Sequence, residues 1–222
     1  MAQSGGPSDI DGPVWVISDV FCCPSPVVLL IVREVMNLTS GNFVVKDVNG
    51  NVLFRAKEIF FTMHGRQVLL DAFENPIVNI RKKIMTAHKR CHVFKGDISD
   101  ARDLLFTTKR HSILPCDNEI QVFLPNNKVE EICDFRVKWE ERSCVVYLGE
   151  SSTAIAEMKR KHNVQSVVFG KDKLILTVYP QIDYAFIVAL IVFLDDVYSE
   201  GRYDLLWSAA TKLASFGIGV AG

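Results

Sequence analysis

The sequence lacks an apolar run long enough to span a membrane. Crossing a bilayer takes roughly 20 apolar residues in a helix, and the long oily run from Tyr184 to Leu194 is too short. Asp183 precedes this run and Asp195 and Asp196 follow it, and a carboxylate near the centre of a bilayer is costly. A helix that is hydrophobic on every side must be surrounded by the rest of its protein. The run is therefore predicted to be a buried core helix, and no transmembrane span is expected.

Targeting signals, a cysteine framework and a strong net charge are also lacking. The N-terminus has neither a basic start nor an apolar core, so no secretory signal is visible, and Ala2 in place of glycine excludes myristoylation. Six cysteines are scattered along the chain, which in a reducing compartment indicates mostly buried thiols. A net charge of −1 argues against direct binding to nucleic acid. We expect a cytoplasmic protein, with a peripheral membrane location or a nuclear one as open alternatives.

Motifs for catalysis, cofactors and metals are missing as well. Residues 217–222 fit G-x-G-x-x-G, but that fingerprint needs a strand before it and a helix after it, and here the chain ends. His88, Cys91 and His92 lie close together, yet zinc takes four ligands and no second pair is visible. Residues 149–153 lack the last glycine of a nucleophile elbow. The sequence predicts no enzymatic activity, no metal site and no cofactor.

The chain does contain a long series of short strands. Across residues 14–180, β-favouring runs alternate with turn signals, which is typical of an all-β sandwich or barrel. Asn49-Gly50 predicts a two-residue hairpin turn, and residues 74–76 join the next pair of strands. Residues 153–162 fit either a strand or a helical turn. Further strands are predicted at Arg66–Asp71, Ile77–Lys83, Cys91–Phe94, Leu104–Thr108, Ile120–Leu124, Phe135–Trp139, Ser143–Leu148, Ser166–Phe169 and Lys173–Tyr179.

The strands and the oily run together predict a mainly β fold, an antiparallel closed β-barrel around a hydrophobic helix near residues 183–196. Several strands alternate apolar and polar residues, so the sheet has one dry face that needs cover. A wide barrel is not filled by its own side chains, and an apolar helix threaded through it fills that space. At about 1.5 Å per residue the run is about 16 Å long, which suits the depth of one barrel. The predicted core side chains are Tyr184, Phe186, Ile187, Leu190, Phe193 and Leu194.

Basic residues form three clusters, at residues 81–90, 109–111 and 159–162. They are either solvated loops and strand ends or parts of one anion-binding face. Alternation along a strand sends Arg81 and Lys83 to one face and Lys82 to the other. The candidate lipid-binding residues are Arg81, Lys82, Lys83, Lys89, Arg90, Lys109 and Arg110.

The ends of the chain are expected to lie outside the single barrel domain of residues 14–200. Residues 1–13 are predicted to be a flexible tail, and residues 201–222 a C-terminal extension. Within the extension, residues 204–216 fit an amphipathic helix, for which packing on the barrel end is favoured over membrane contact. Cys22-Cys23 suggests acylation, although packing at the barrel edge is the favoured interpretation.

Four stretches of the sequence resemble one known family, the plant LURP-one-related family. They are Asp47–Phe54, Leu70–Ile77, Arg81–Gly96 and Asp183–Leu190. The resemblance covers nearly the whole chain, from Val14 to Tyr198. Because that family is similar to the tubby C-terminal domain and the phospholipid scramblases, the resemblance implies a barrel of about 12 strands closed around a central C-terminal helix. It also implies a tie to plant defence and kinship with membrane-tethered regulators.

Two functions are compatible with these observations. The first is a non-enzymatic, lipid-responsive module whose basic clusters meet anionic phospholipid headgroups such as phosphoinositides, each Lys or Arg contributing about 1 kcal/mol near the membrane. The second is a scaffold whose loops bind protein partners without lipid. Scramblases are described with an acidic calcium-binding segment before the apolar helix, whereas residues 170–174 carry one acid between two lysines, so no calcium-driven activity is expected. Whether the basic clusters fall on one face distinguishes the two functions.

Overall fold

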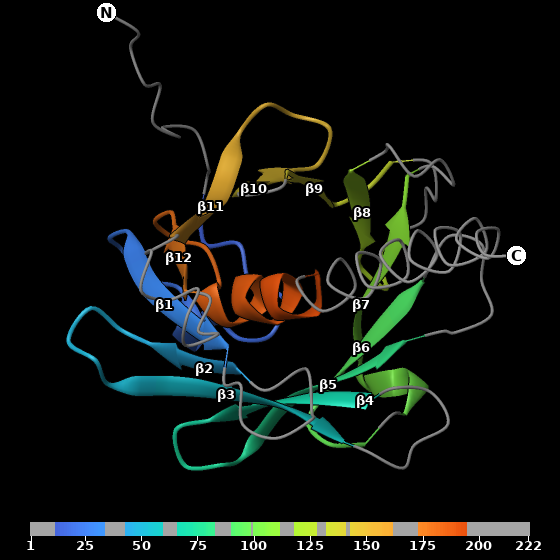
Figure 1. The fold of residues 1–222 in the computed structure, drawn as a ribbon. Coiled ribbons are helices and arrows are strands. Elements are labelled where there is room, and N and C mark those ends of the chain that lie inside the picture. The colour runs from blue at the N-terminus through green and yellow to red at the C-terminus, as the bar shows by residue number, and fades with distance from the viewer. Residues whose placement is uncertain are drawn as a thin grey trace, which may run out of the picture.

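The computed structural model describes residues 12–33, 43–59, 66–82, 90–98, 100–111, 118–127, 132–140, 143–161 and 173–194. Within these ranges the chain forms twelve strands, two short 3-10 helices and one α-helix at residues 184–194 (Figure 1). The 3-10 helices are η1 (Asp19–Phe21) and η2 (Ala101–Asp103). The strands are β1 (Val27–Arg33), β2 (Phe43–Lys46), β3 (Val52–Ile59), β4 (Arg66–Asp71), β5 (Pro76–Lys82), β6 (Cys91–Lys95), β7 (Leu104–Arg110), β8 (Glu119–Phe123), β9 (Phe135–Trp139), β10 (Ser143–Leu148), β11 (Ala154–Lys161) and β12 (Lys173–Val178).

All twelve strands join in one antiparallel sheet that closes on itself. Each strand pairs with its neighbours in sequence, and β1 also pairs with β12 over Val27↔Val178 to Val32↔Lys173. A closed sheet leaves no edge strand open for pairing with another chain. The predicted closed antiparallel barrel is confirmed, and so is its central C-terminal helix.

The helix lies inside the barrel and fills it (Figure 1). Every residue from Ala185 to Leu194 is buried, and Tyr184 is half-buried. The Phe186 ring packs edge-on against Phe106 of β7, with 5.2 Å between ring centroids, and tilted against Phe135 of β9 at 4.8 Å. The Phe186 side chain thus contacts inward-facing side chains of two strands. Among the described residues, no helix has both the length and the apolar character that crossing a membrane requires.

A buried carboxylate fixes the start of the helix. Asp183 is fully buried, and its Oδ1 accepts a hydrogen bond from the Phe186 N–H at 2.9 Å, which caps the first turn. Its Oδ2 accepts hydrogen bonds from the N–H groups of Val16, Ile17 and Ser18 at 3.2, 2.7 and 3.1 Å. Successive backbone N–H groups that converge on one oxygen compensate an anion for its lost hydration. Asp183 therefore ties the N-terminal segment to the helix.

The β2–β3 turn is longer than the sequence predicts. The Asp47 N–H donates to the Asn51 carbonyl at 2.9 Å, so three residues lie between the paired positions instead of two. The Asp47 carboxylate accepts hydrogen bonds from the N–H groups of Asn49 and Asn51 at 2.9 and 2.8 Å, and Gly50 alone in this turn takes a positive φ, of 89°. The two-residue prediction is wrong because the aspartate side chain stabilises a wider loop.

The β4–β5 turn repeats this design with one difference. The Asp71 carboxylate accepts hydrogen bonds from the N–H groups of Phe73 and Asn75, both at 2.8 Å. At the position equivalent to Gly50 stands Glu74, with φ of 67°, a conformation that is uncommon outside glycine. In both turns the hydrogen bonds from asparagine side chains lower the pKa of the aspartate.

Several predicted segments are now placed. The segment that the sequence left open, residues 153–162, is a strand, β11, paired with β10 and β12. The bounds of β1, a continuous apolar run, were not predicted from the sequence. The predicted strand at residues 166–169, the tail up to residue 11 and the extension at 201–222 lie outside the described residues.

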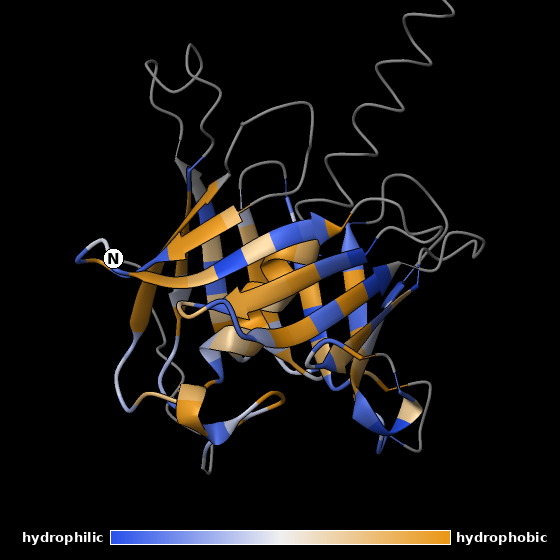
Figure 2. Cartoon of the chain, turned by 90° about the horizontal axis from the view of Figure 1, so that it is seen from below, coloured by the Kyte–Doolittle hydropathy of each residue, from blue (hydrophilic) through white to orange (hydrophobic). Residues whose placement is uncertain are grey.

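Because neighbouring strands are antiparallel, the connections sort to two ends of the barrel. We call one end the turn end; its described residues are 12–26, 47–51, 72–75, 96–98, 100–103, 124–127, 132–134, 149–153 and 179–183. The opposite end, which we call the basic end, is formed by the last residues of the odd-numbered strands and the first residues of the even-numbered strands. In Figure 2 most of the described turns lie at the lower end of the barrel.

Candidate functional site

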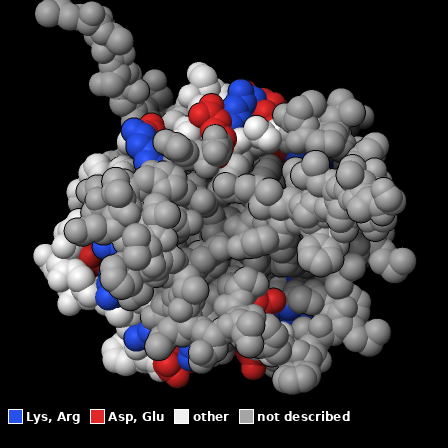
Figure 3. All heavy atoms as spheres, in the orientation of Figure 1, with Lys and Arg blue, Asp and Glu red and all other residues white. Residues whose placement is uncertain are grey.

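Charged residues are unequally shared between the two ends of the barrel. Among the described residues, the acids at the basic end are Glu58, Glu119 and Glu140, whereas the basic strand residues there are Arg33, Arg66, Arg81, Lys82, Lys109, Arg110, Lys138, Lys159, Arg160, Lys161 and Lys173. At the turn end the described acids prevail, namely Asp19, Asp47, Asp71, Glu74, Asp97, Asp100, Asp103, Asp134, Glu150 and Asp183. Figure 3 looks onto the basic end, where described Lys and Arg side chains lie around the rim with some acidic side chains between them.

Three of the predicted cations lie on neighbouring strands of the outer wall. Arg81 of β5 pairs with His92 of β6, which pairs in turn with Thr107 of β7. Because the core residue Cys91 pairs with Thr108, the register places Lys109 beside Arg90, the residue before β6. Like charges on facing strand positions repel each other. An anion between Arg90 and Lys109 would relieve this repulsion.

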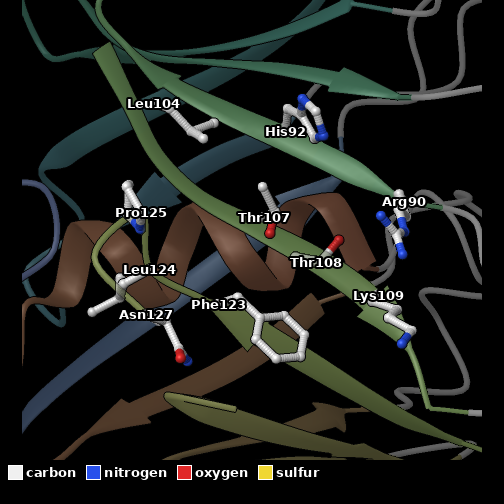
Figure 4. Close-up of a pocket in the computed structure, with 10 residues that line it drawn as sticks. All are labelled: Arg90, His92, Leu104, Thr107, Thr108, Lys109, Phe123, Leu124, Pro125 and Asn127. Atoms are coloured by element: carbon white, nitrogen blue, oxygen red, sulfur yellow. The ribbon is translucent and has the colours of Figure 1, made fainter. Parts of the chain in front are cut away.

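Arg90 and Lys109 line a hollow of about 260 Å³ in the outer wall, between β6, β7 and the end of β8. We call it the outer hollow (Figure 4). The described residues that line it include cations, neutral polar groups and apolar side chains, but no acid; they are Arg90, His92, Leu104, Thr107, Thr108, Lys109, Phe123, Leu124, Pro125 and Asn127. The arrangement suits a ligand that carries negative charge.

The outer hollow has a cationic part and an apolar part. In Figure 4, Arg90 and Lys109 lie toward one side, and Leu104 and Pro125 lie toward the other, with Phe123 between them. The direction of β7 produces this separation, since the strand runs from Leu104 at the turn end to Lys109 near the basic end. About 3.3 Å per residue over five steps separates these two residues by about 17 Å.

Arg110, another predicted cation, does not join this surface. It pairs with buried Ile120, so the register assigns it to an inward-facing position at the end of β7. Lys82 is the last residue of β5 and pairs with Cys91. Lys83 and Lys89 lie outside the described residues.

The third basic cluster also lies apart. Lys159 is on β11, four strands from β7 around the barrel, and its Nζ lies 3.8 Å from the Glu157 carboxylate. The described residues of the basic clusters therefore share one end of the barrel but not one face.

Of the described cysteines, Cys91, Cys133 and Cys144 are buried, and Cys22 and Cys23 are half-buried. The Cys22 thiol donates to the Val14 carbonyl at 3.7 Å, and burial, followed by the charge of Asp183, raises the pKa of Cys22 to about 11. Burial, with a hydrogen bond to Glu150, raises the pKa of Cys133 to about 12. At neutral pH both remain protonated and weakly nucleophilic. Over the described ranges, no group of three or more His, Cys, Asp or Glu side chains is placed to hold a metal ion.

Sequence reasoning missed most of the residues around Lys109. Alternation along β7 could have placed Thr107 and Lys109 on one face. No local signal brings His92 and Phe123 to that face, because each belongs to a different strand and only the register aligns them. Asp183 was noted as a charged flank of the helix, and its capping role was also missed.

Comparison with known proteins gives consistent matches over most of the chain. The family model described as LURP-one-related matches residues 27–195. Protein LURP-one-related 15 of Arabidopsis thaliana is 52% identical over 201 residues, which is 90% of this chain and 92% of that protein. Protein LURP1 of the same plant is 43% identical, over 85% of this chain and 92% of its own. An X-ray structure of an Arabidopsis thaliana protein, 45% identical, covers 83% of this chain and 98% of that one with a TM-score of 0.66.

Proposed function

The chain belongs to the LURP-one-related family, and on that premise we propose that it is a non-enzymatic module that binds anionic phospholipid headgroups, phosphoinositides among them, through its basic end. The observation that carries the proposal is the position of Arg81, Arg90 and Lys109 on adjacent strands of one outer wall. Acidic residues gather at the opposite end of the barrel, so an anionic surface would attract one end and repel the other.

The expected affinity is modest. Each Lys or Arg near an anionic membrane contributes about 1 kcal/mol, so the three outer-wall cations would contribute about 3 kcal/mol. This is enough for a reversible, peripheral attachment whose strength depends on salt. We place the protein in the cytoplasm or at the inner membrane surface, and we extend the proposal to plant defence, for which the support is the family resemblance alone.

The test is a sedimentation series with phosphatidylcholine vesicles that contain phosphoinositide. Binding should fade as salt rises, because the Debye length shrinks from about 10 Å at 0.1 M to about 3 Å at 1 M. Arg81→Glu/Lys83→Glu should abolish binding, and thermal melts should show that the variant remains folded. The matched control is Lys95→Glu, which reverses an exposed charge near the turn end and should bind as the wild type does.

One observation favours the alternative, a protein-interaction scaffold. Two adjacent hairpin turns carry exposed apolar side chains, Phe73 with 86% and Val48 with 76% of its surface accessible. Large exposed apolar side chains in turns are unusual, because turns favour Gly, Pro, Asn, Asp and Ser. If the wild type ignores anionic vesicles at low salt, or if the folded double variant binds equally well, the lipid proposal fails and the scaffold gains.

A further inference from the structure

The outer hollow places cationic and apolar side chains around a space of the size of a small molecule. We propose that it binds a small amphipathic anion, a phosphate or carboxylate group attached to an apolar ring or short chain. This inference goes beyond the proposed function, since it requires a dissolved ligand and no membrane. Three features of the hollow support it: the cation pair, the apolar wall beside the pair and the size of the space.

The cation pair provides the site for the anionic group. The register sets Arg90 and Lys109 side by side on neighbouring strands, and none of the described residues that line the hollow is acidic. Thr107, two residues before Lys109 and on the same face of β7, adds a hydroxyl group, which can donate a hydrogen bond to an anionic oxygen. Guanidinium and ammonium groups that share an oxyanion form charge-assisted hydrogen bonds, which are about twice as strong as neutral ones.

The apolar wall provides the site for the rest of the ligand. Gln121 is the residue directly opposite Lys109, so Phe123 lies diagonally from Lys109, at about 7 to 8 Å between backbone positions. That separation matches a molecule whose anionic group and ring are directly bonded. Leu104 and Pro125 continue the apolar wall away from the cations.

The volume limits what the hollow accepts. At about 260 Å³ it is just below the roughly 300 to 1,000 Å³ of drug-sized pockets, so it suits a compact molecule. A bare inorganic anion would leave the apolar wall hydrated, and a neutral ring would form no charge-assisted hydrogen bond with Arg90 or Lys109. Only a ligand with both parts satisfies both halves of the hollow.

The experiment uses phenyl phosphate as the probe and follows backbone amide shifts of the full chain by NMR. We expect saturable shifts at β6, β7 and β8, with at least tenfold weaker binding of both inorganic phosphate and benzyl alcohol. Phe123→Ala should weaken phenyl phosphate binding about tenfold and leave inorganic phosphate binding unchanged. Lys109→Ala should weaken both phosphates, and the control Lys159→Ala, on a distant strand, should weaken neither.

Three results would overturn the inference. These are equal affinities for phenyl phosphate and inorganic phosphate, shifts centred away from the outer hollow, and an unchanged affinity in folded Phe123→Ala. The ligand source is distinguished by vesicle sedimentation of Phe123→Ala. Vesicle binding that survives this substitution while phenyl phosphate binding is lost supports a dissolved ligand, and loss of both would show that the hollow serves the lipid headgroup instead. Failure of the proposed function is read separately, from Arg81→Glu/Lys83→Glu.

Discussion

The two faces of β7 show how differently the inside and the outside of this barrel are specified. Phe106 points inward and is buried, packed against Phe186 of the helix. Thr107 and Lys109 point outward and line the outer hollow. Inward positions must complement the helix in shape, because a closed interior has no solvent to fill gaps. Outward positions contact water, so their side chains need not fit the helix and can serve binding.

The difference means that the same strand serves stability with one face and recognition with the other. Substitutions inside should act on the free energy of unfolding, and substitutions outside should act on binding. Variants on the two faces test this division.

The largest effect is expected inside the barrel, from Phe186→Asp. The aspartate would be an unpaired charge in a site with no exposure, so the chain should fail to fold, as should a truncation before Tyr184. Circular dichroism and urea unfolding would measure the loss. The control, Leu190→Met, conserves volume and should cost less than about 1.5 kcal/mol. A folded, cooperatively melting Phe186→Asp protein would refute the view that the helix supports the barrel.

A smaller but still large effect is expected from Asp183→Ala. This change removes the acceptor of four backbone N–H groups and leaves these buried donors unsatisfied. By analogy with breaking a buried charged pair, the free energy of unfolding should fall by about 3 to 5 kcal/mol. Urea unfolding would measure it. The control Asp19→Ala removes an exposed acid from the same segment and should change stability by less than about 0.5 kcal/mol.

The interior was largely predictable from the sequence because its signals are local. The oily run and the period-two alternation of the strands do not depend on distant residues. The sequence did not decide between strand and helix for β11. There the register shifts between Val146 and Tyr147 of the paired strand, and both Ile155 and Ala156 are buried. Two consecutive inward residues break the alternation, so the periodicity of this segment was ambiguous.

The outer site was predictable only as a set of basic residues. Arg81, Arg90 and Lys109 could be named as candidates, but their arrangement depends on cross-strand register. A register shift between Val93 and Phe94 of β6 contributes to that arrangement and leaves no trace in the local pattern. Turn chemistry had a similar limit, because the Asp47 side chain selects a three-residue loop where Asn49-Gly50 indicated two.

The smallest effect on stability is expected outside, from Lys109→Ala. This side chain packs in no core, and its removal relieves repulsion from Arg90, so the free energy of unfolding should change by less than about 0.5 kcal/mol. At low salt a slight stabilisation is expected, since charges this close are least screened there. The matched variant on the inner face, Phe106→Ala, should cost about 3 to 5 kcal/mol. Urea unfolding of both variants at low and high salt measures the contrast. A loss above about 1.5 kcal/mol for Lys109→Ala would mean that the outer wall also supports the fold, and the division between the two faces of β7 would not hold.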